Sequence, residues 1–505
     1  MSPIDLRQPV PEPDKAAPSA AVDRKHPRGL YTLFFTEMWE RFSFYGMRAL
    51  LVLFMVDAVR GGMGMDDKTA TAIYGLYTAS VYLMSLPGGW LADRLWGAQR
   101  AVWIGGIIIA LGHFTLALPW TQTFYLGLIF VVIGSGTLKP NMSGLVGDLY
   151  PEGGARRDAG FTIFYMGVNL GAALGPMVCG WLAKEKGWHW GFAAAGVGMV
   201  LGLIQFRLSR HLLSGAGVRR GNEKPLHVSE RFILFGGTTL GILVTALLLT
   251  GALALNPLFI ARGMAYVILA IAFAFFAYAF LFCQLEKVEK ERVAMILVLF
   301  LTSAIFWSGF EQAGSSFNLF AERFTTREFN WLHYEIPAAW FQSLGAVFVI
   351  SFAPWFAFLW VWLARRNLDP SIPVKFGLGL LFLAAGFVVL AGAAKVVASG
   401  EKAWPTWLVT TYLLHTFGEL CLSPVGLSSV TKLSPRKLVG QMMGIWFLAT
   451  SLGNLLAGLL AGEFKTDSIQ NWPVMFLKIV MLPAVAGLML ILLSKPIKRL
   501  MAGVK

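Results

Sequence analysis

The stretch FFTEMWERFSFYGMRALLVLF, residues 34–54, decides the fold of this chain. It is long enough to cross about 30 Å of hydrocarbon as a helix, yet four of its side chains are charged: Glu37, Glu40, Arg41 and Arg48. A charge at the bilayer centre costs about 2.5–3.5 kcal/mol. The four positions recur at helical spacing and share one face. Because lipid would reject that face, we expect it to look into a polar interior; a purely structural ion-pair network is the alternative.

Apolar stretches of this kind make up most of the chain. Of its 505 residues, 56% are hydrophobic and 14% are charged, whereas soluble domains carry about 25% charged residues. Fourteen stretches of roughly 18–25 residues are long enough to span a bilayer. They lie near 29–56, 69–92, 101–120, 124–149, 160–183, 189–206, 232–254, 259–284, 294–320, 339–363, 374–397, 406–431, 440–462 and 473–494. The sequence therefore predicts an all-α protein with fourteen transmembrane helices in a lipid bilayer.

The basic residues are distributed unevenly between the two sides of these segments. The net charge of +14 alone could suggest a nucleic-acid partner. With fourteen crossings, however, both termini lie on one side, and that side carries 28 Lys and Arg against 10 on the other. Cytoplasmic loops carry such an excess. We therefore expect a multi-pass protein of the cell (inner) membrane with both termini in the cytoplasm and no nucleic-acid partner.

A faint internal repeat divides the chain into two halves. A shift of 284 residues places Gly134 on Gly418 and Pro140 on Pro424. Two parallel halves resemble the plan of the major facilitator superfamily, two six-helix bundles, here with two additional helices between them. The expected divisions are a disordered cytoplasmic tail (1–28), an N-terminal bundle (29–206), a basic cytoplasmic loop (207–231), a two-helix insertion (232–284), a C-terminal bundle (294–494) and a cytoplasmic C-terminus (495–505).

Three further segments carry polar side chains at membrane depth. Lys139 precedes Pro140 in segment 124–149. Segment 294–320 carries Trp307, Glu311, Ser315 and Asn318 at helical spacing, and segment 406–431 carries Thr411, His415, Glu419 and Ser423. Each stripe alone could be helix-packing contacts. Together they put cations in one half and anions in the other, and a cavity between such walls would suit a zwitterion with separated ends, such as a peptide.

Motifs of direct energy use and catalysis are missing from the sequence. It contains no GxxxxGK[ST], HExxH, CxxC or GxSxG. This argues against ATP-driven transport and against a membrane-embedded enzyme, and a receptor would not require charge on both walls. The remaining energy source is an ion gradient, so we expect a secondary transporter without a cofactor.

Four motifs, taken in order, resemble the proton-dependent oligopeptide transporter family. They are EMWERFSFYG (37–46), GGWLADRLWG (88–97), the stretch 134–148 with GSGTLKPN and GD, and the pair FWSGFEQAGSS (306–316) and ELCLSPVGLS (419–428). The resemblance implies proton-coupled symport of di- and tripeptides into the cytoplasm by alternating access. The peptide and protons would be its partners, and we expect it to function as a monomer.

The resemblance also implies a role for each matching residue. The proton-coupling group would be Glu37, Glu40, Arg41, Lys139 and Glu311. Arg41, Arg48 and Lys139 would face the peptide carboxylate, with Tyr45 and Tyr82 nearby. Asn169 and Glu419 would meet the amine beside Ser423, and Trp307 and Trp446 would line side-chain pockets.

Two departures from the family pattern concern the peptide contacts. Phe44 stands where the family commonly has a first tyrosine, and Gly345 stands at the asparagine of its QSxNP motif. The sequence therefore leaves open the length and side-chain preference for peptides. A proton-coupled carrier of amino acids, nitrate or a drug-like molecule is the alternative.

Overall fold

The computed structural model describes residues 25–152, 154–218, 227–252, 256–329, 333–464 and 466–501. Most of the predicted tail, part of the basic loop and the last residues of the predicted C-terminus lie outside these ranges. The long helices are α1 (Gly29–Val56), α2 (Asp67–Leu91), α3 (Ala98–Leu116), α4 (Thr121–Asp148), α5 (Gly154–Lys186), α6 (Trp188–Ser209), α7 (Val228–Leu249), α8 (Pro257–Phe282), α9 (Lys287–Phe310), α11 (Ser343–Arg365), α12 (Ile372–Ala398), α13 (Pro405–Leu433), α14 (Val439–Ala461) and α15 (Trp472–Leu492).

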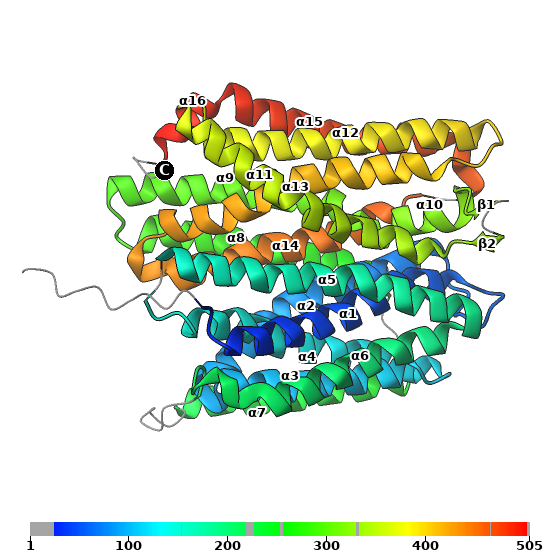
Figure 1. Cartoon of the computed structure of the whole chain (residues 1–505), viewed down its shortest axis with the longest axis horizontal. Helices are drawn as coiled ribbons and strands as arrows, with labels where there is room; N and C mark the ends of the chain where they lie inside the picture. The colour runs from blue at the N-terminus through cyan, green and yellow to red at the C-terminus, as the bar shows by residue number, and fades with distance from the viewer. Residues whose placement is uncertain are drawn as a thin grey trace, which may run out of the picture.

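Shorter elements join these helices. They are η1 (Ala92–Trp96), η2 (Arg210–Leu213), η3 (Glu311–Gly314), α10 (Ser316–Phe324), β1 (Glu328–Phe329), β2 (Tyr334–Glu335), η4 (Ala338–Gln342), η5 (Arg436–Leu438), η6 (Thr466–Asn471) and α16 (Ser494–Arg499). The long helices run side by side along the long axis (Figure 1). We call the end with the start of α1 and with α16 the terminal end, and the end with the β1–β2 hairpin the hairpin end.

The prediction of an all-α membrane protein is confirmed. Within the described ranges, eleven helical segments are apolar and long enough to cross a membrane. The predicted spans that become α1, α2 and α13 are not among them, although these helices have 28, 25 and 29 residues. Charged and polar side chains lower the apolar character of α1 and α13. The exact number of fourteen spans stays a prediction.

The membrane span predicted over 294–320 is found as the helical segment Lys287–Phe324, but it is interrupted in its middle. α9 ends at Phe310, a short 3₁₀ turn follows, and Ser315 leaves helical geometry with φ −123° and ψ −95° before α10 begins. Gly314 passes so close to α2 that an added Cβ would lie 1.9 Å from the Tyr74 hydroxyl. The predicted stripe is therefore divided: Trp307 lies in α9, Glu311 in the 3₁₀ turn η3 and Asn318 in α10, while Ser315 stands between the last two.

The internal repeat corresponds to equivalent helix crossings in the two halves. In α4, a Cβ on Gly134 would lie 2.7 Å from the carbonyl oxygen of Gly105 in α3. In α13, a Cβ on Gly418 would lie 2.7 Å from the carbonyl oxygen of Gly379 in α12. Both crossings bring two backbones together at glycine, as is usual where membrane helices pack closely. The repeated glycines thus mark the same contact in each half.

The inserted helices α7 and α8 differ in how they pack. One face of α8, including Ala265, Ile268 and Phe276, is buried against neighbouring helices. The described side chains along α7 are largely exposed. Near its start, Glu230 forms an ion pair with Arg94 of η1. α7 therefore lies at the periphery of the bundle, whereas α8 packs against α2 of the N-terminal half and α14 of the C-terminal half.

Candidate functional site

The charged face of α1 is buried, as its helical spacing predicts. Glu37, Glu40, Arg41 and Arg48 are each at most 6% exposed. The Nε atom of Arg41 lies 2.9 Å from Oε1 of Glu37 and 2.7 Å from Oε2 of Glu40. Within the described ranges, the other Glu37 oxygen and both Glu40 oxygens accept no hydrogen bond. Two carboxylates therefore share one guanidinium, and one negative charge is left poorly compensated.

Arg48 joins the two halves of the molecule. Its Nη2 donates to Oε2 of Glu311 at 2.5 Å, and its Nε donates to the Tyr74 hydroxyl at 2.6 Å. The break after α9 places Glu311 in a 3₁₀ turn beside α1. Further along the chain, in α10, the side-chain amide of Asn318 donates to the carbonyl oxygen of Ala49 in α1 at 2.8 Å. Two hydrogen bonds, one from Arg48 to Glu311 and one from Asn318 to Ala49, therefore join the segment after α9 to α1.

Lys139 of α4 adds a cation to the charged cluster of α1 without a direct ion pair to a described carboxylate. Its Nζ lies 4.1 Å from the ring centre of Tyr82 and 5.5 Å from that of Phe44. Within the described part of the chain, no carboxylate oxygen lies within 4.0 Å of it. Glu311, which the family resemblance paired with Lys139, is bonded to Arg48 in this conformation. Lys139 is therefore held by aromatic faces.

A cavity of about 120 Å³ lies between the two halves and gathers most of the predicted substrate residues. Its lining includes Tyr45, Arg48, Tyr82, Asn169, Trp307, Glu311 and Glu419. The cation comes from α1, and the carboxylates come from η3 and α13. The cavity is therefore positive on one wall and negative on the other, as the stripes predict.

Four of the predicted substrate-binding residues do not line this cavity. Arg41 and Lys139 lie in the charged cluster beside it, and Ser423 lies one turn beyond Glu419. Trp446 of α14 is buried against Gly426, where an added Cβ would lie 2.3 Å from the indole ring. In this conformation Trp446 fills a gap within the C-terminal half.

Sequence reasoning missed Tyr74 and Tyr412 of the site, whereas it named His415 in a polar stripe and Gly345 as a departure from the family pattern. Tyr74, which binds Arg48, stands two turns before Tyr82 on α2, so a stripe at steps of four could have revealed it. Tyr412 and His415 line the cavity from α13, and His415 packs among the rings of Phe317 and Phe387. Gly345 also lines the cavity, and a Cβ there would meet nothing within 4 Å.

Ion pairs close the hairpin end of the molecule. The carboxylate of Asp67 in α2 accepts two hydrogen bonds from Arg323 in α10, from Nη1 to Oδ2 at 2.6 Å and from Nη2 to Oδ1 at 2.7 Å. Three more pairs between the halves lie at the same end: Arg60–Glu322, Lys68–Glu463 and Lys184–Glu335. The cavity is therefore shut off from the hairpin end in this conformation.

The loop that follows α1 is organised by Asp57. Trp188 donates to its carboxylate at 2.7 Å, and the backbone amides of Val59 and Arg60 donate as well. Partial burial raises the pKa of Asp57, but these hydrogen bonds and the charge of Arg60 outweigh it and hold the pKa below its ordinary value of 3.8. The carboxylate is thus ionised where it supports the closed end.

Known proteins resemble this chain along nearly its whole length. A family model described as the POT family matches residues 99–475. The peptide transporter YePEPT of Yersinia enterocolitica is 44% identical over 489 residues, covering 94% of this chain and 95% of that protein. A di-/tripeptide transporter of Lactococcus lactis subsp. cremoris is 34% identical over 493 residues, covering 95% and 97%.

The fold has a similar counterpart among solved structures. A variant of peptide transporter POT in complex with alafosfalin matches with a TM-score of 0.86 and 40% sequence identity. The match covers 95% of this chain and 96% of that structure. The resemblance therefore extends from the motifs to the arrangement of the helices over nearly the whole chain.

Proposed function

Because this chain belongs to the POT family, we propose that it imports di- and tripeptides together with protons by alternating access. The protein is a membrane transporter and not an enzyme. Its family is the one that the four sequence motifs indicate. The single observation that carries the coupling proposal is the Arg48–Glu311 ion pair, which joins the two halves on the wall of the cavity.

The bipolar cavity supports a peptide as the substrate. A zwitterionic peptide carries a carboxylate at one end and an ammonium group at the other. Arg48 offers a cation to the carboxylate, and Glu419 with the amide of Asn169 offers acceptors to the amine. The names of the relatives from Yersinia and Lactococcus point to the same class of substrate. Among peptides, di- and tripeptides have the ends closest together, which fits a cavity of about 120 Å³.

The α1 cluster supports protons as the driving ion. A buried carboxylate without a compensating charge is costly, and a proton relieves that cost. Glu37 and Glu40 share the guanidinium of Arg41, so binding one proton there leaves this group of three side chains neutral. We therefore assign the proton to these two carboxylates and assign to Arg41 the link between them and the substrate wall.

Glu311 couples the cluster to movement of the halves. When Glu311 is charged, its bond to Arg48 holds α1 and η3 together. A proton on Glu311, or a peptide carboxylate that competes for Arg48, removes this attraction and favours separation. We propose that Lys139 receives Glu311 in other states of the cycle, and that Ser423 and Trp446 contact substrate there.

The charge distribution supports one orientation in the membrane, and an inward proton gradient would then drive transport into the cytoplasm. The side with 28 Lys and Arg would be cytoplasmic, so the terminal end faces the cytoplasm and the hairpin end faces outward. Residues 29–206 and 294–494 would move against each other, while α7 stays peripheral. One chain supplies both walls of the cavity, so a monomer would suffice in the cell (inner) membrane.

Uptake into proteoliposomes tests the proposal. An inward proton gradient should drive labelled dialanine into vesicles, and each proton moved through 100 mV supplies about 2.3 kcal/mol, roughly fifty-fold accumulation. Failure of every di- and tripeptide to accumulate would overturn it. Competition with amino acids, nitrate and drug-like molecules separates peptide transport from the alternative cargoes.

A further inference from the structure

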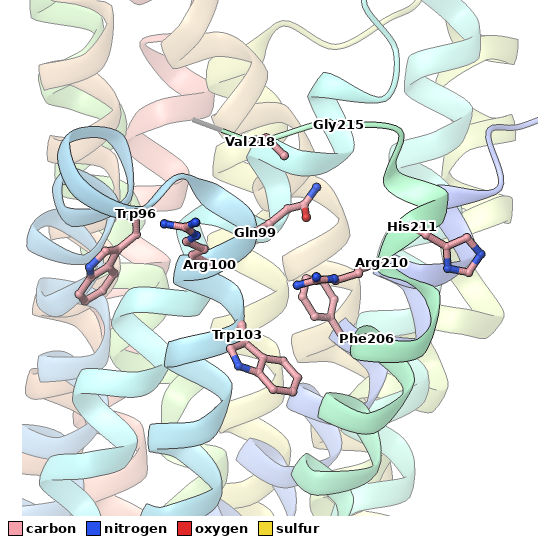
Figure 2. A pocket seen from close by; sticks show the side chains of 10 residues that line it. Trp96, Gln99, Arg100, Trp103, Phe206, Arg210, His211, Gly215 and Val218 are labelled. Atoms are coloured by element: carbon pink, nitrogen blue, oxygen red, sulfur yellow. The ribbon is translucent and has the colours of Figure 1, made fainter. Parts of the chain in front are cut away.

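A pocket at the terminal end lies outside the transport site. It measures about 790 Å³ and is bounded by η1 and α3 on one side and by α6 and η2 on the other. Figure 2 shows the side chains of Trp96, Arg100 and Trp103 on the first side and those of Phe206, Arg210 and His211 on the second. Its wall therefore combines aromatic rings with basic groups.

The pocket has cations to offer to a ligand. Both arginines are exposed, and the structure gives neither a carboxylate partner among the residues it describes. None of the described residues that line the pocket is acidic. Planar guanidinium groups suit phosphate oxygens, with which they form paired hydrogen bonds. The chemistry of the wall therefore favours a phosphate-bearing anion.

The rim of the pocket is held in place by a hydrogen bond and by close packing. The side-chain amide of Gln99 donates to the carbonyl oxygen of Ala216 at 2.7 Å, which fastens the chain after η2 to α3. Gly217 has φ +66°, and a Cβ there would lie 2.2 Å from Leu145. On the floor, Trp103 and Phe206 stack at 6.5 Å. These contacts keep the two walls at a fixed separation.

The surface that continues along α3 and α6 is apolar. On α3, Leu111 is 53% exposed, and on α6, Ile204 and Leu208 are 51% and 71% exposed. Such side chains on helices of a membrane protein face acyl chains. Tryptophan is enriched where hydrocarbon meets headgroups. A ligand of the pocket can therefore place a charged group between the arginines and hydrocarbon beside the helices.

We propose that this pocket binds the phosphate of an anionic phospholipid of the inner leaflet, with its acyl chains along α3 and α6. Basic pockets between helices on the cytoplasmic side bind such headgroups. The leaflet follows from the orientation given under the proposed function. Binding itself does not depend on that orientation, so it is measurable even if the transport proposal fails.

Native mass spectrometry of the full-length protein in detergent micelles tests the proposal. The probes are phosphatidylglycerol, phosphatidylcholine and inorganic phosphate. The double variant Arg100→Gln/Arg210→Gln removes the cations of the pocket. The matched control Arg365→Gln/Arg366→Gln removes the same charge from the end of α11, where Arg366 also lies over a tryptophan, Trp362. Gel filtration of every variant verifies that it folds. If the glutamine variant does not fold, the variant Arg100→Lys/Arg210→Lys, which keeps both positive charges, takes its place.

The expected result is preferential retention of phosphatidylglycerol by the natural protein. The pocket variant should retain it about thirty-fold more weakly, as expected for two charges near an anionic lipid, while the control stays within about threefold. The lysine variant should fall between them, because it keeps charge but loses paired hydrogen bonds. Equal losses in pocket and control variants, equal retention of phosphatidylcholine, or full displacement by millimolar phosphate would overturn a lipid site.

Discussion

Arg48 on α1 and Glu311 on η3 stand 263 residues apart and meet at 2.5 Å between Nη2 and Oε2. Both are buried, and both line the cavity between the halves. A buried ion pair contributes little net stability, but neutralising one partner leaves the other charge uncompensated. This pair is therefore better suited to switching between conformations than to holding one of them.

The substitution Glu311→Gln should uncouple transport. Neutralising one partner of a buried pair costs about 2–5 kcal/mol, so we expect gradient-driven dialanine uptake to fall at least about thirty-fold while counterflow exchange persists. Both rates are measured in the same proteoliposomes. Glu322→Gln removes a partly exposed carboxylate that pairs with Arg60 and Arg327 at the hairpin end; Arg327 keeps its pair with Glu335, so uptake should change less than about fivefold. A similar loss in both variants would contradict a special role for Glu311.

Glu37→Gln tests the proton assignment. The amide cannot bind and release a proton, but it can still accept the hydrogen bond from Arg41 Nε that the carboxylate accepts at 2.9 Å. We expect gradient-driven uptake to be abolished and counterflow exchange to be partly retained. Ser43→Ala, which removes a buried hydroxyl bonded to the Glu40 backbone, serves as the control on the same helix. Unchanged driven uptake in the glutamine variant would make Glu37 structural.

Local features of the site could be predicted from the sequence, whereas contacts across the molecule could not. Helical spacing alone places Glu37, Glu40 and Arg41 on one buried face, and α1 has the predicted bounds, 29–56. The Arg48–Glu311 bond depends on a helix break beside Gly314, and the crowding that requires this glycine comes from Tyr74 on another helix. Such packing has no signature in the periodicity of a single segment.

Gly171→Ala should destabilise the N-terminal half. A Cβ at this position of α5 would lie 2.1 Å from the carbonyl oxygen of Met38 and 2.8 Å from the amide nitrogen of Phe42, both on α1. Overpacking costs about 1–3 kcal/mol or more where backbone must move, so the apparent melting temperature should fall by several degrees. The apparent melting temperature is measured by heating samples to a series of temperatures and quantifying the remaining folded protein by gel filtration. Gly144→Ala, with nothing within 4 Å, should be neutral or slightly stabilising; equal losses would contradict the crossing argument.

Asp57→Asn should lower stability in a pH-dependent manner. The pKa of Asp57 is depressed below 3.8 in the folded protein, so its stabilisation is present above about pH 4 and is lost as the pH falls through the folded-state value. For this partly exposed carboxylate we expect about 1 kcal/mol at pH 7. Melting curves of both proteins from pH 7 to pH 3 should converge only at the acidic end. Trp188→Phe removes one of the hydrogen bonds to Asp57 and should reproduce part of the loss of stability. If the stability difference between Asp57→Asn and the natural protein were independent of pH, the effect would come from altered packing and not from the charge of the carboxylate.

Gly345→Asn should strengthen peptide binding. Gly345 lines the cavity from α11 on the same side as Glu419, and a Cβ there meets nothing within 4 Å, so a larger side chain has room to project inward. The amide oxygen of asparagine can accept a hydrogen bond from the peptide ammonium, and a bond to a charged group adds about 1 kcal/mol or more. We therefore expect the KM for dialanine to fall about fivefold with kcat within about twofold, measured by initial uptake rates over a range of concentrations. Gly345→Leu adds similar volume without an acceptor and should leave KM unchanged or raise it. If leucine lowers KM as much as asparagine does, packing and not the missing amide limits affinity at this wall of the cavity.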